Sequence, residues 1–272
     1  MPLSRRKFLF LSFLGVSGLL FLDAFWIEKY IVNWSKHDLR KGGGEYIKLI
    51  QLTDLHIREI KTYHIWIAKR IKKEDPDLLC FTGDSIDRPD QLALLESFLK
   101  MIPVEIPKVV IMGNKEYDGK ITHEDYQELF GRFNGQLLVN ETISFEKDGR
   151  KLNIIGIDDL LNGSPDYKMA VNDLDKSLET VILNHCPQYR DTIDVLNKDL
   201  NVRIKLILSG HTHGGQIQIF GKEFFKPGGS GSYLNGWYKS DESLMYVSKG
   251  VGTSRNLPIR FGARAEIPIF YL

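Results

Sequence analysis

The chain has 272 residues, of which 43% are hydrophobic and 26% are charged, as in an ordinary globular protein. Its formal net charge is +1, so it has no excess of basic residues to form a broad nucleic-acid footprint. These values favour a globular domain. They argue against a protein whose main activity is unspecific binding of long nucleic acids.

The N-terminal segment has the features of a bacterial export signal. Arg5 and Arg6 form a pair that is followed by residues 8–22, which contain no charge. A paired arginine before an apolar stretch resembles the twin-arginine signal, so we expect export by the twin-arginine translocase. A plain membrane anchor with basic residues on the inner side is the alternative.

The segment shows no good cleavage site. A small-x-small pattern is missing after the apolar run, and residues 22–24 are a poor substitute. The apolar stretch extends to Ile27 with Asp23 as its one charge, which gives about 20 residues, near the length that spans a bilayer. We therefore predict a signal or uncleaved anchor over residues 1–27. The remaining chain would lie on the extracytoplasmic side of the cell membrane.

A polar stretch over residues 28–45, with three glycines at 42–44, predicts a linker. The domain predicted for residues 46–272 begins with strands that alternate with helices, which indicates α/β architecture with parallel pairing. The expected strands are 47–52, 78–82 and 109–112, and the expected helices are 63–73, 91–101 and 124–133. Further strands are expected at 142–146 and 152–157, as a hairpin, and at 181–183, 204–208 and 267–272.

Five groups of polar residues follow or end these strands. They are Asp54-Leu55-His56, Gly83-Asp84, Gly113-Asn114-Lys115-Glu116, Asn184-His185-Cys186-Pro187 and Gly210-His211-Thr212-His213-Gly214-Gly215. Each group alone is weak, because a lone Asp or His is usually a turn or surface residue. Residues i and i+2 at a strand end point the same way, and strand ends of an open α/β sheet share one crevice. The five groups together therefore predict a metal site, whereas His37, His64 and His123 lie outside the pattern.

This order of motifs resembles the calcineurin-like metallophosphoesterases from residue 46 to the C-terminus. Residues 210–216, 250–254 and 257–262 resemble a membrane-associated bacterial branch that includes twin-arginine exported phosphodiesterases and is linked to UDP-2,3-diacylglucosamine hydrolysis. The resemblance implies a two-sheet sandwich flanked by helices. It also implies two divalent metal ions. Asp54, His56 and His213 would hold one ion, Asn114, His185 and His211 would hold the other, and Asp84 would bridge them.

A ligand set of carboxylates, an amide and imidazoles suits Mn, Fe or Zn. Two such ions would hold a hydroxide that attacks a phosphoryl group, so no serine or cysteine nucleophile is needed. The two cysteines, Cys80 and Cys186, are expected to be packing residues, and nothing argues for a bridge between them.

Lys115 departs from the family pattern, which usually has a histidine that protonates the leaving group. A lysine keeps a positive charge beside phosphate oxygens but is a poor proton donor near neutral pH. The lipid-sugar pyrophosphate hydrolases of the family are similar in carrying an arginine here.

The sequence therefore predicts a hydrolase of phosphodiester or pyrophosphate bonds whose candidate substrate is a membrane lipid precursor such as UDP-2,3-diacylglucosamine. A nucleotide phosphodiesterase or nuclease is one alternative, and an exported envelope-binding protein with an inactive metal site is another. Export conflicts with a UDP-linked substrate, because UDP-sugars are normally found inside the cell.

Overall fold

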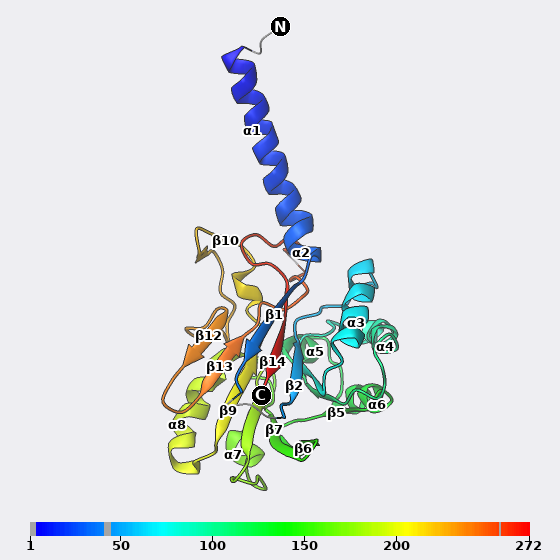
Figure 1. Ribbon diagram of the computed structural model, residues 1–272, viewed down its shortest axis with the longest axis vertical. Helices are drawn as coiled ribbons and strands as arrows, with labels where there is room; N and C mark the ends of the chain where they lie inside the picture. The colour runs from blue at the N-terminus through cyan, green and yellow to red at the C-terminus, as the bar shows by residue number, and fades with distance from the viewer. Residues whose placement is uncertain (1–3, 41–44, 256) are drawn as a thin grey trace.

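The computed structural model describes residues 4–40, 45–255 and 257–272 (Figure 1). Two six-stranded sheets pack face to face, and helices cover their outer faces. The first sheet has the order β1 (Asn33–Asp38), β14 (Glu266–Tyr271), β2 (Lys48–Leu52), β3 (Leu78–Thr82), β4 (Lys108–Ile111) and β5 (Gly135–Leu137). The second has the order β12 (Gly236–Lys239), β13 (Leu244–Val247), β9 (Ile204–Ser209), β8 (Glu179–Leu183), β7 (Arg150–Gly156) and β6 (Glu141–Lys147). The predicted two-sheet sandwich flanked by helices is confirmed.

The burial of strand β3 explains why almost all of its residues are apolar. Leu78 and Cys80 face the core between the two sheets, whereas Leu79 and Phe81 face the core beneath the helices. Because side chains alternate along a strand and both faces are covered, every position is buried. Cys80 is accordingly a free, buried cysteine.

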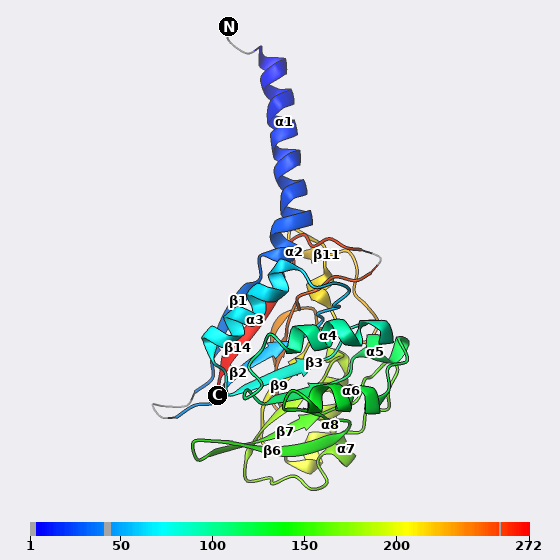
Figure 2. The same cartoon turned by 90° about the vertical axis from the view of Figure 1, so that its right-hand side faces the viewer.

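Helices pack on both outer faces. Figure 2 shows those that cover the first sheet: α3 (Thr62–Glu74), α4 (Leu92–Leu99) and α6 (His123–Gly131). Helices α7 (Tyr167–Ala170) and α8 (Arg190–Leu200) cover the second. A short helix, α5 (Asn114–Asp118), begins directly after the turn that follows β4, which places its first residues at the strand end. The predicted hairpin is present as β6 and β7, paired antiparallel in register from Glu141↔Gly156 to Lys147↔Arg150.

The N-terminal helix α1 (Arg5–Leu22) projects away from the domain (Figure 1). It continues through a π-helical turn (Asp23–Ile27) into α2 (Glu28–Tyr30), and none of its residues is buried. By length and composition alone, Arg5–Tyr30 could cross a membrane, a test that an N-terminal signal sequence also passes.

Residues 33–38 differ from the prediction. The sequence predicts a linker over residues 28–45, but Asn33–Asp38 form β1, which pairs in parallel with β14 along its whole length. Trp34 packs beside the core under the helices, and the Ser35 hydroxyl donates to Glu266 Oε1 at 2.8 Å. The segment is polar because it is an edge strand, so polarity by itself gave no strand signal. The glycines at 42–44 lie outside the described residues.

Candidate metal centre

The seven predicted ligands come together at one edge of the sandwich, on loops that follow β2, β3, β4, β8 and β9. All seven are nearly buried, from Asp54 and His185 at 0% exposure to His213 at 8%. Burying two carboxylates this deeply is unfavourable unless cations accompany them. The parallel arrangement of the strands brings these loops together, since the carboxyl ends of parallel strands lie at the same edge of a sheet.

Three of the histidines are oriented by hydrogen bonds from the ring nitrogen that points away from the centre. His56 Nδ1 lies 2.5 Å from Asp87 Oδ1, His185 Nδ1 lies 2.7 Å from the Thr82 carbonyl, and His211 Nε2 lies 2.6 Å from the Gly228 carbonyl. A carbonyl or carboxylate can only accept, so these nitrogens carry the hydrogens. In the neutral form of each ring, the opposite nitrogen holds a free lone pair that faces the centre, as in metal-binding histidines.

Asp54, His56 and His213 form one cluster of ligand atoms, all within 4.8 Å of one another. His56 Nε2 and His213 Nε2 are 3.1 Å apart, and His213 Nε2 lies 3.6 Å from Asp54 Oδ1. The backbone N–H of His211 donates to both Asp54 oxygens and thereby holds the carboxylate in place.

Asn114, His185 and His211 form the second cluster. The Asn114 Oδ1 atom lies 3.0 Å from His211 Nδ1 and 3.3 Å from His185 Nε2. Because His211 holds its hydrogen on Nε2, its Nδ1 lone pair faces another acceptor at this short distance. A divalent cation among these atoms would relieve that repulsion, so the residues fit a metal ion.

Asp84 lies between the two clusters. One of its oxygens, Oδ1, is 3.4 Å from His185 Nε2, and the other, Oδ2, is 3.7 Å from His56 Nε2. Burial opposes ionisation of Asp84, but the neighbouring histidines, His185 first, hold its pKa well below its usual range. Conversely, Asp84 outweighs the burial of His185 and raises the pKa of that ring to about 10. The Asp84 carboxylate therefore lies between His185 and His56, and its negative charge favours a cation on either side.

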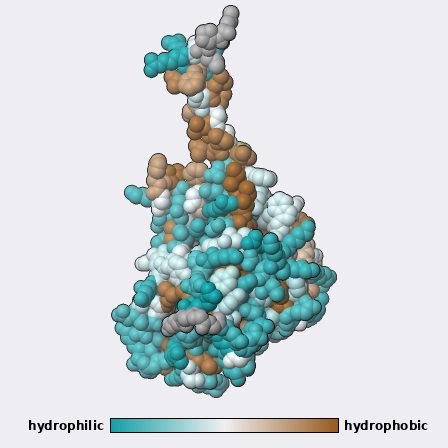
Figure 3. All heavy atoms as spheres, viewed as in Figure 1, coloured by the Kyte–Doolittle hydropathy of each residue, from teal (hydrophilic) through white to brown (hydrophobic). Residues whose placement is uncertain are grey.

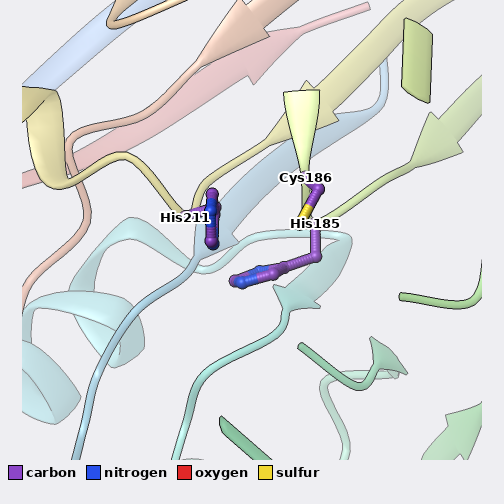
Figure 4. A group of neighbouring side chains, drawn as sticks. All are labelled: His185, Cys186 and His211. Carbon is purple, nitrogen blue, oxygen red and sulfur yellow. The ribbon is translucent and has the colours of Figure 1, made fainter. Parts of the chain in front are cut away.

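Cys186 lies next to the second cluster. Figure 4 shows it beside His185 and His211, and its Sγ lies within 4.8 Å of a ring nitrogen of each. The thiol donates to Asp159 Oδ1 at 3.3 Å, and burial, aided by Asp159, raises its pKa well above the usual value. Cys186 is therefore a buried free thiol beside the predicted ligands, and its role as a packing residue stays a prediction.

Several of the predicted ligands have strained backbones. Asp54, His56, Asp84, His211 and His213 all have positive φ angles, between 44° and 71°. Such angles are uncommon for residues other than glycine, and each costs on the order of 1 kcal/mol. Position 83, directly before Asp84, requires glycine, because a Cβ there would lie 2.5 Å from His185 Nδ1.

Glu116 belongs to the third motif, but the sequence alone predicts no role for it. Its carboxylate is fully buried and accepts from the backbone N–H groups of Gly113, Asp84 and Ser85 at 2.7–2.9 Å. Burial and the Asp84 charge raise the pKa of Glu116 to about 7. It therefore ties the loop that carries Asp84 to the loop that carries Asn114. In the sequence, only its position two residues after Asn114 could have pointed to this role.

Arg260 and Asp87 were also missed. Arg260 is completely buried, donates to backbone carbonyls such as Gly252 and Ala263, and lies 3.4 Å from His213 Nδ1. Burial lowers its pKa to about 10. Asp87 accepts from Arg58 Nε at 2.8 Å while it backs His56. No local spacing points to either residue, because both reach the site through tertiary contacts.

A cavity of about 1210 Å³ opens over the two clusters. Its lining includes Lys115, whose Nζ forms an ion pair with Asp118 at 2.6 Å. Burial opposes the charge on Lys115, but Asp118 outweighs it and raises the pKa of the ammonium group. The three histidines outside the pattern lie elsewhere. For example, His37 stacks on Phe270 at 5.2 Å.

A two-sheet α/β sandwich with a carboxylate–histidine centre at its strand ends defines a metal-dependent hydrolase. The model of the calcineurin-like phosphoesterase family matches residues 47–215, and the chain belongs to this family. It is therefore a metal-dependent phosphoesterase, and members of its family use divalent metals.

Among known proteins, the chain is 31% identical to the uncharacterized metallophosphoesterase YkuE of Bacillus subtilis (strain 168), over 99% of this chain and 98% of that protein. It is 27% identical to a transmembrane protein with metallophosphoesterase domain from Bos taurus, over 81% of this chain and 52% of that protein. Among solved structures, TT1561 of Thermus thermophilus aligns with a TM-score of 0.52 at 11% identity, over 76% and 91% of the two chains. That likeness shows the fold alone.

Proposed function

We propose that the chain hydrolyses a phosphodiester or pyrophosphate bond at a centre of two divalent ions bridged by Asp84. The observation that carries this proposal is the placement of Asp84, whose two oxygens face separate histidine clusters at 3.4 and 3.7 Å. The first ion would be held by Asp54, His56 and His213, and the second by Asn114, His185 and His211. Mn, Fe or Zn fits these oxygen and nitrogen ligands.

Two such ions would supply a hydroxide near neutral pH and neutralise charge on the phosphoryl group. The chain's own residues set the geometry around that reaction. Glu116 holds the Asp84 and Asn114 loops together, and Arg260 braces the loop of His213. Lys115 adds a fixed positive charge at the cavity wall, where the departing oxygens would lie.

The cavity walls support a substrate with both a phosphate and an apolar part. Cationic side chains on the wall suit phosphate oxygens, and they include Arg58, Arg88, Lys115, Lys120 and Arg255. Apolar side chains line the same cavity, and they include Leu161, Phe225 and Leu257. A lipid-linked pyrophosphate such as UDP-2,3-diacylglucosamine has both parts. A nucleotide diester lacks the long apolar chains that such walls would favour.

Turnover of the purified full chain tests this function. We expect metal-dependent hydrolysis of an aryl phosphodiester after loading with Mn²⁺, and faster hydrolysis of a lipid-linked pyrophosphate than of a nucleotide diester of matched charge. Elemental analysis should find two ions per chain. A protein that binds two ions yet turns over no substrate would instead be a binding protein with an inactive centre.

We further propose that the N-terminal segment is read by the twin-arginine translocase and keeps the domain on the extracytoplasmic side of the membrane. Arg5 and Arg6 lie at the start of an exposed apolar helix, which supports both roles. Export should be lost when both arginines are changed to lysine, because the charge remains and the motif does not. A reporter fused after Leu272 reads the side directly. A cytoplasmic signal would favour a UDP-linked substrate, and an outer signal would favour another phosphate ester.

A further inference from the structure

The hairpin of β10 (Gln218–Ile219) and β11 (Lys222–Glu223) displays large apolar side chains to solvent. Phe220 is fully exposed, and Phe224 and Phe225 are 71% and 66% exposed. Figure 3 shows brown spheres over this hairpin, close to the apolar helix. A group of exposed aromatic residues of this kind marks a surface that contacts something else.

The backbone at the hairpin tip strengthens this interpretation. Phe220 and Gly221 have φ angles of 52° and 74°, as in a type I′ turn, where Asn, Asp or Gly is preferred. A phenylalanine with positive φ is strained, and its ring packs on nothing within the described chain. The contact that compensates for this strain is therefore one with a partner outside the domain.

The hairpin is held beside the foot of the N-terminal helix by the segment 258–265. The backbone N–H of Gln218 donates to the Phe261 carbonyl at 2.6 Å, which joins this segment to the hairpin. Arg260 N–H donates to the Ala24 carbonyl at 3.1 Å, and Ala263 N–H donates to Glu28 Oε2 at 2.9 Å, which join it to the helix. Figures 1 and 2 both show the hairpin at the end of the domain from which α1 emerges.

We propose that the tip of this hairpin, Phe220 with Phe224, inserts into the surface of the same lipid bilayer that holds α1. This inference rests on the proposed membrane anchoring and adds a second point of contact. Continuity with the helix selects the bilayer as the occupant, since any surface beside the helix foot faces the headgroup region. Aromatic residues favour that region, and Trp26 lies at the foot of the helix, exposed by 54%.

The charges around the tip suit the same partner. Lys222, in β11, is exposed, whereas Lys226, which follows the hairpin, forms an ion pair with Glu223 at 3.8 Å. Lysines beside aromatic residues contact lipid phosphates while the rings enter the apolar boundary.

The insertion would also orient the cavity. The chain continues from β11 into Phe225 and Gly228, which line the cavity, and the Gly228 carbonyl accepts from His211 Nε2. A single helix anchor leaves the domain free to tilt. Two contacts would set the cavity beside the bilayer surface, where a phosphate on a lipid headgroup can reach the centre.

Site-specific labelling of the full chain tests the proposal. A bimane label on Phe220→Cys is compared with labels on Phe13→Cys, within α1, and Asp148→Cys, at the β6–β7 turn on the opposite end of the domain (Figure 1). Cys80 and Cys186 are buried, so the label goes to the introduced thiol. The proteins are reconstituted in vesicles of phosphatidylethanolamine and phosphatidylglycerol, with and without brominated acyl chains, which quench bimane on contact.

We expect brominated lipid to reduce emission about twofold or more at positions 13 and 220 and to leave position 148 unchanged. Adding Phe224→Ser to the Phe220→Cys protein should reduce quenching at 220, and turnover of a soluble aryl ester by that protein shows that it is folded. Quenching at 13 without quenching at 220 overturns the proposal, whether the tip then faces water or a protein. Absence of quenching at both positions refutes the anchor as well. Neither result depends on which phosphate ester is cleaved.

Discussion

The two halves of the proposed metal centre differ in the groups that hydrogen-bond to their predicted ligands. In the half of Asp54, His56 and His213, a carboxylate is itself a ligand, and a second carboxylate, Asp87, backs His56. In the half of Asn114, His185 and His211, the side-chain oxygen ligand is a neutral amide, and backbone carbonyls back both histidines. Asp84 is shared. The predicted ligands of the first half therefore carry one more negative charge than those of the second, while the buried Arg260 places a positive charge 3.4 Å from His213 Nδ1.

This difference indicates how the centre would load. A carboxylate behind a histidine makes the ring more basic and binds the metal more tightly, and an anionic ligand does so more directly. We infer that the half of Asp54 fills first and that the half of Asn114 exchanges its ion more readily. The predictions below test that asymmetry, beginning with the residue that belongs to both halves.

Asp84→Ala should have the largest effect, since Asp84 is the residue proposed to hold both ions. We expect turnover at saturating Mn²⁺ to fall on the order of 10³-fold, which corresponds to about 4 kcal/mol of lost charge stabilisation. His56→Ala weakens one half only and should retain more activity. Equal residual turnover in the two variants would contradict the bridging position of Asp84.

Glu116→Gln should loosen both halves together, because the amide presents an N–H where the carboxylate accepts from backbone N–H groups. We expect affinity for both ions to fall about 10–100-fold, as for other residues that orient ligands. Tyr126→Phe removes only the hydroxyl that donates to Glu116 Oε1, at 3.0 Å, and is the matched control. Isothermal titration with Mn²⁺ measures both sites. Loss of one ion alone would show that Glu116 does not tie the two loops.

Asp87→Asn should act on one half, because Asp87 backs only His56 among the ligands. The first ion should bind about 10-fold more weakly, and the second should be unaffected. Asp118→Asn removes an acid from the same cavity that backs no histidine, so it should leave metal content unchanged. Stepwise chelation followed by elemental analysis distinguishes the halves. If the wild type loses both ions at one chelator concentration, the asymmetry is absent.

Lys115 should have the smallest effect and one that depends on the leaving group. Lys115→Ala should slow all substrates about 10-fold through loss of a positive charge. Lys115→His should improve alkyl esters selectively, because a basic leaving alkoxide gains most from a proton donor. The measurement is kcat/KM for one aryl ester, one alkyl ester and one pyrophosphate. A wild type that already prefers alkyl esters would mean that another group supplies the proton.

The α/β sandwich and the seven candidate ligands could be predicted from the sequence, because the hydrophobic runs and motifs that indicate them lie within a few neighbouring residues. The hydrophobic runs of β2, β3, β4 and β9 are buried on both faces, so each stands out as a strand. The motif residues follow at short spacings. By contrast, β1 was predicted as linker, because an edge strand with one polar face resembles a tether. The short helix α5 begins at a ligand, Asn114, and has no apolar repeat of its own.

By itself, the sequence determined the buried strands β2, β3, β4 and β9, the apolar N-terminal segment and the residue types of the predicted metal centre, since each is encoded by neighbours along the chain. Only the tertiary structure decided what stands behind those ligands. Glu116 bonds to Asp84 across 32 residues, and Gly228 meets His211 across 17. The docking of segment 258–265 against the helix foot likewise joins Ala263 to Glu28 across 235 residues. Such contacts depend on how packed elements meet in space, which no local pattern of residues specifies.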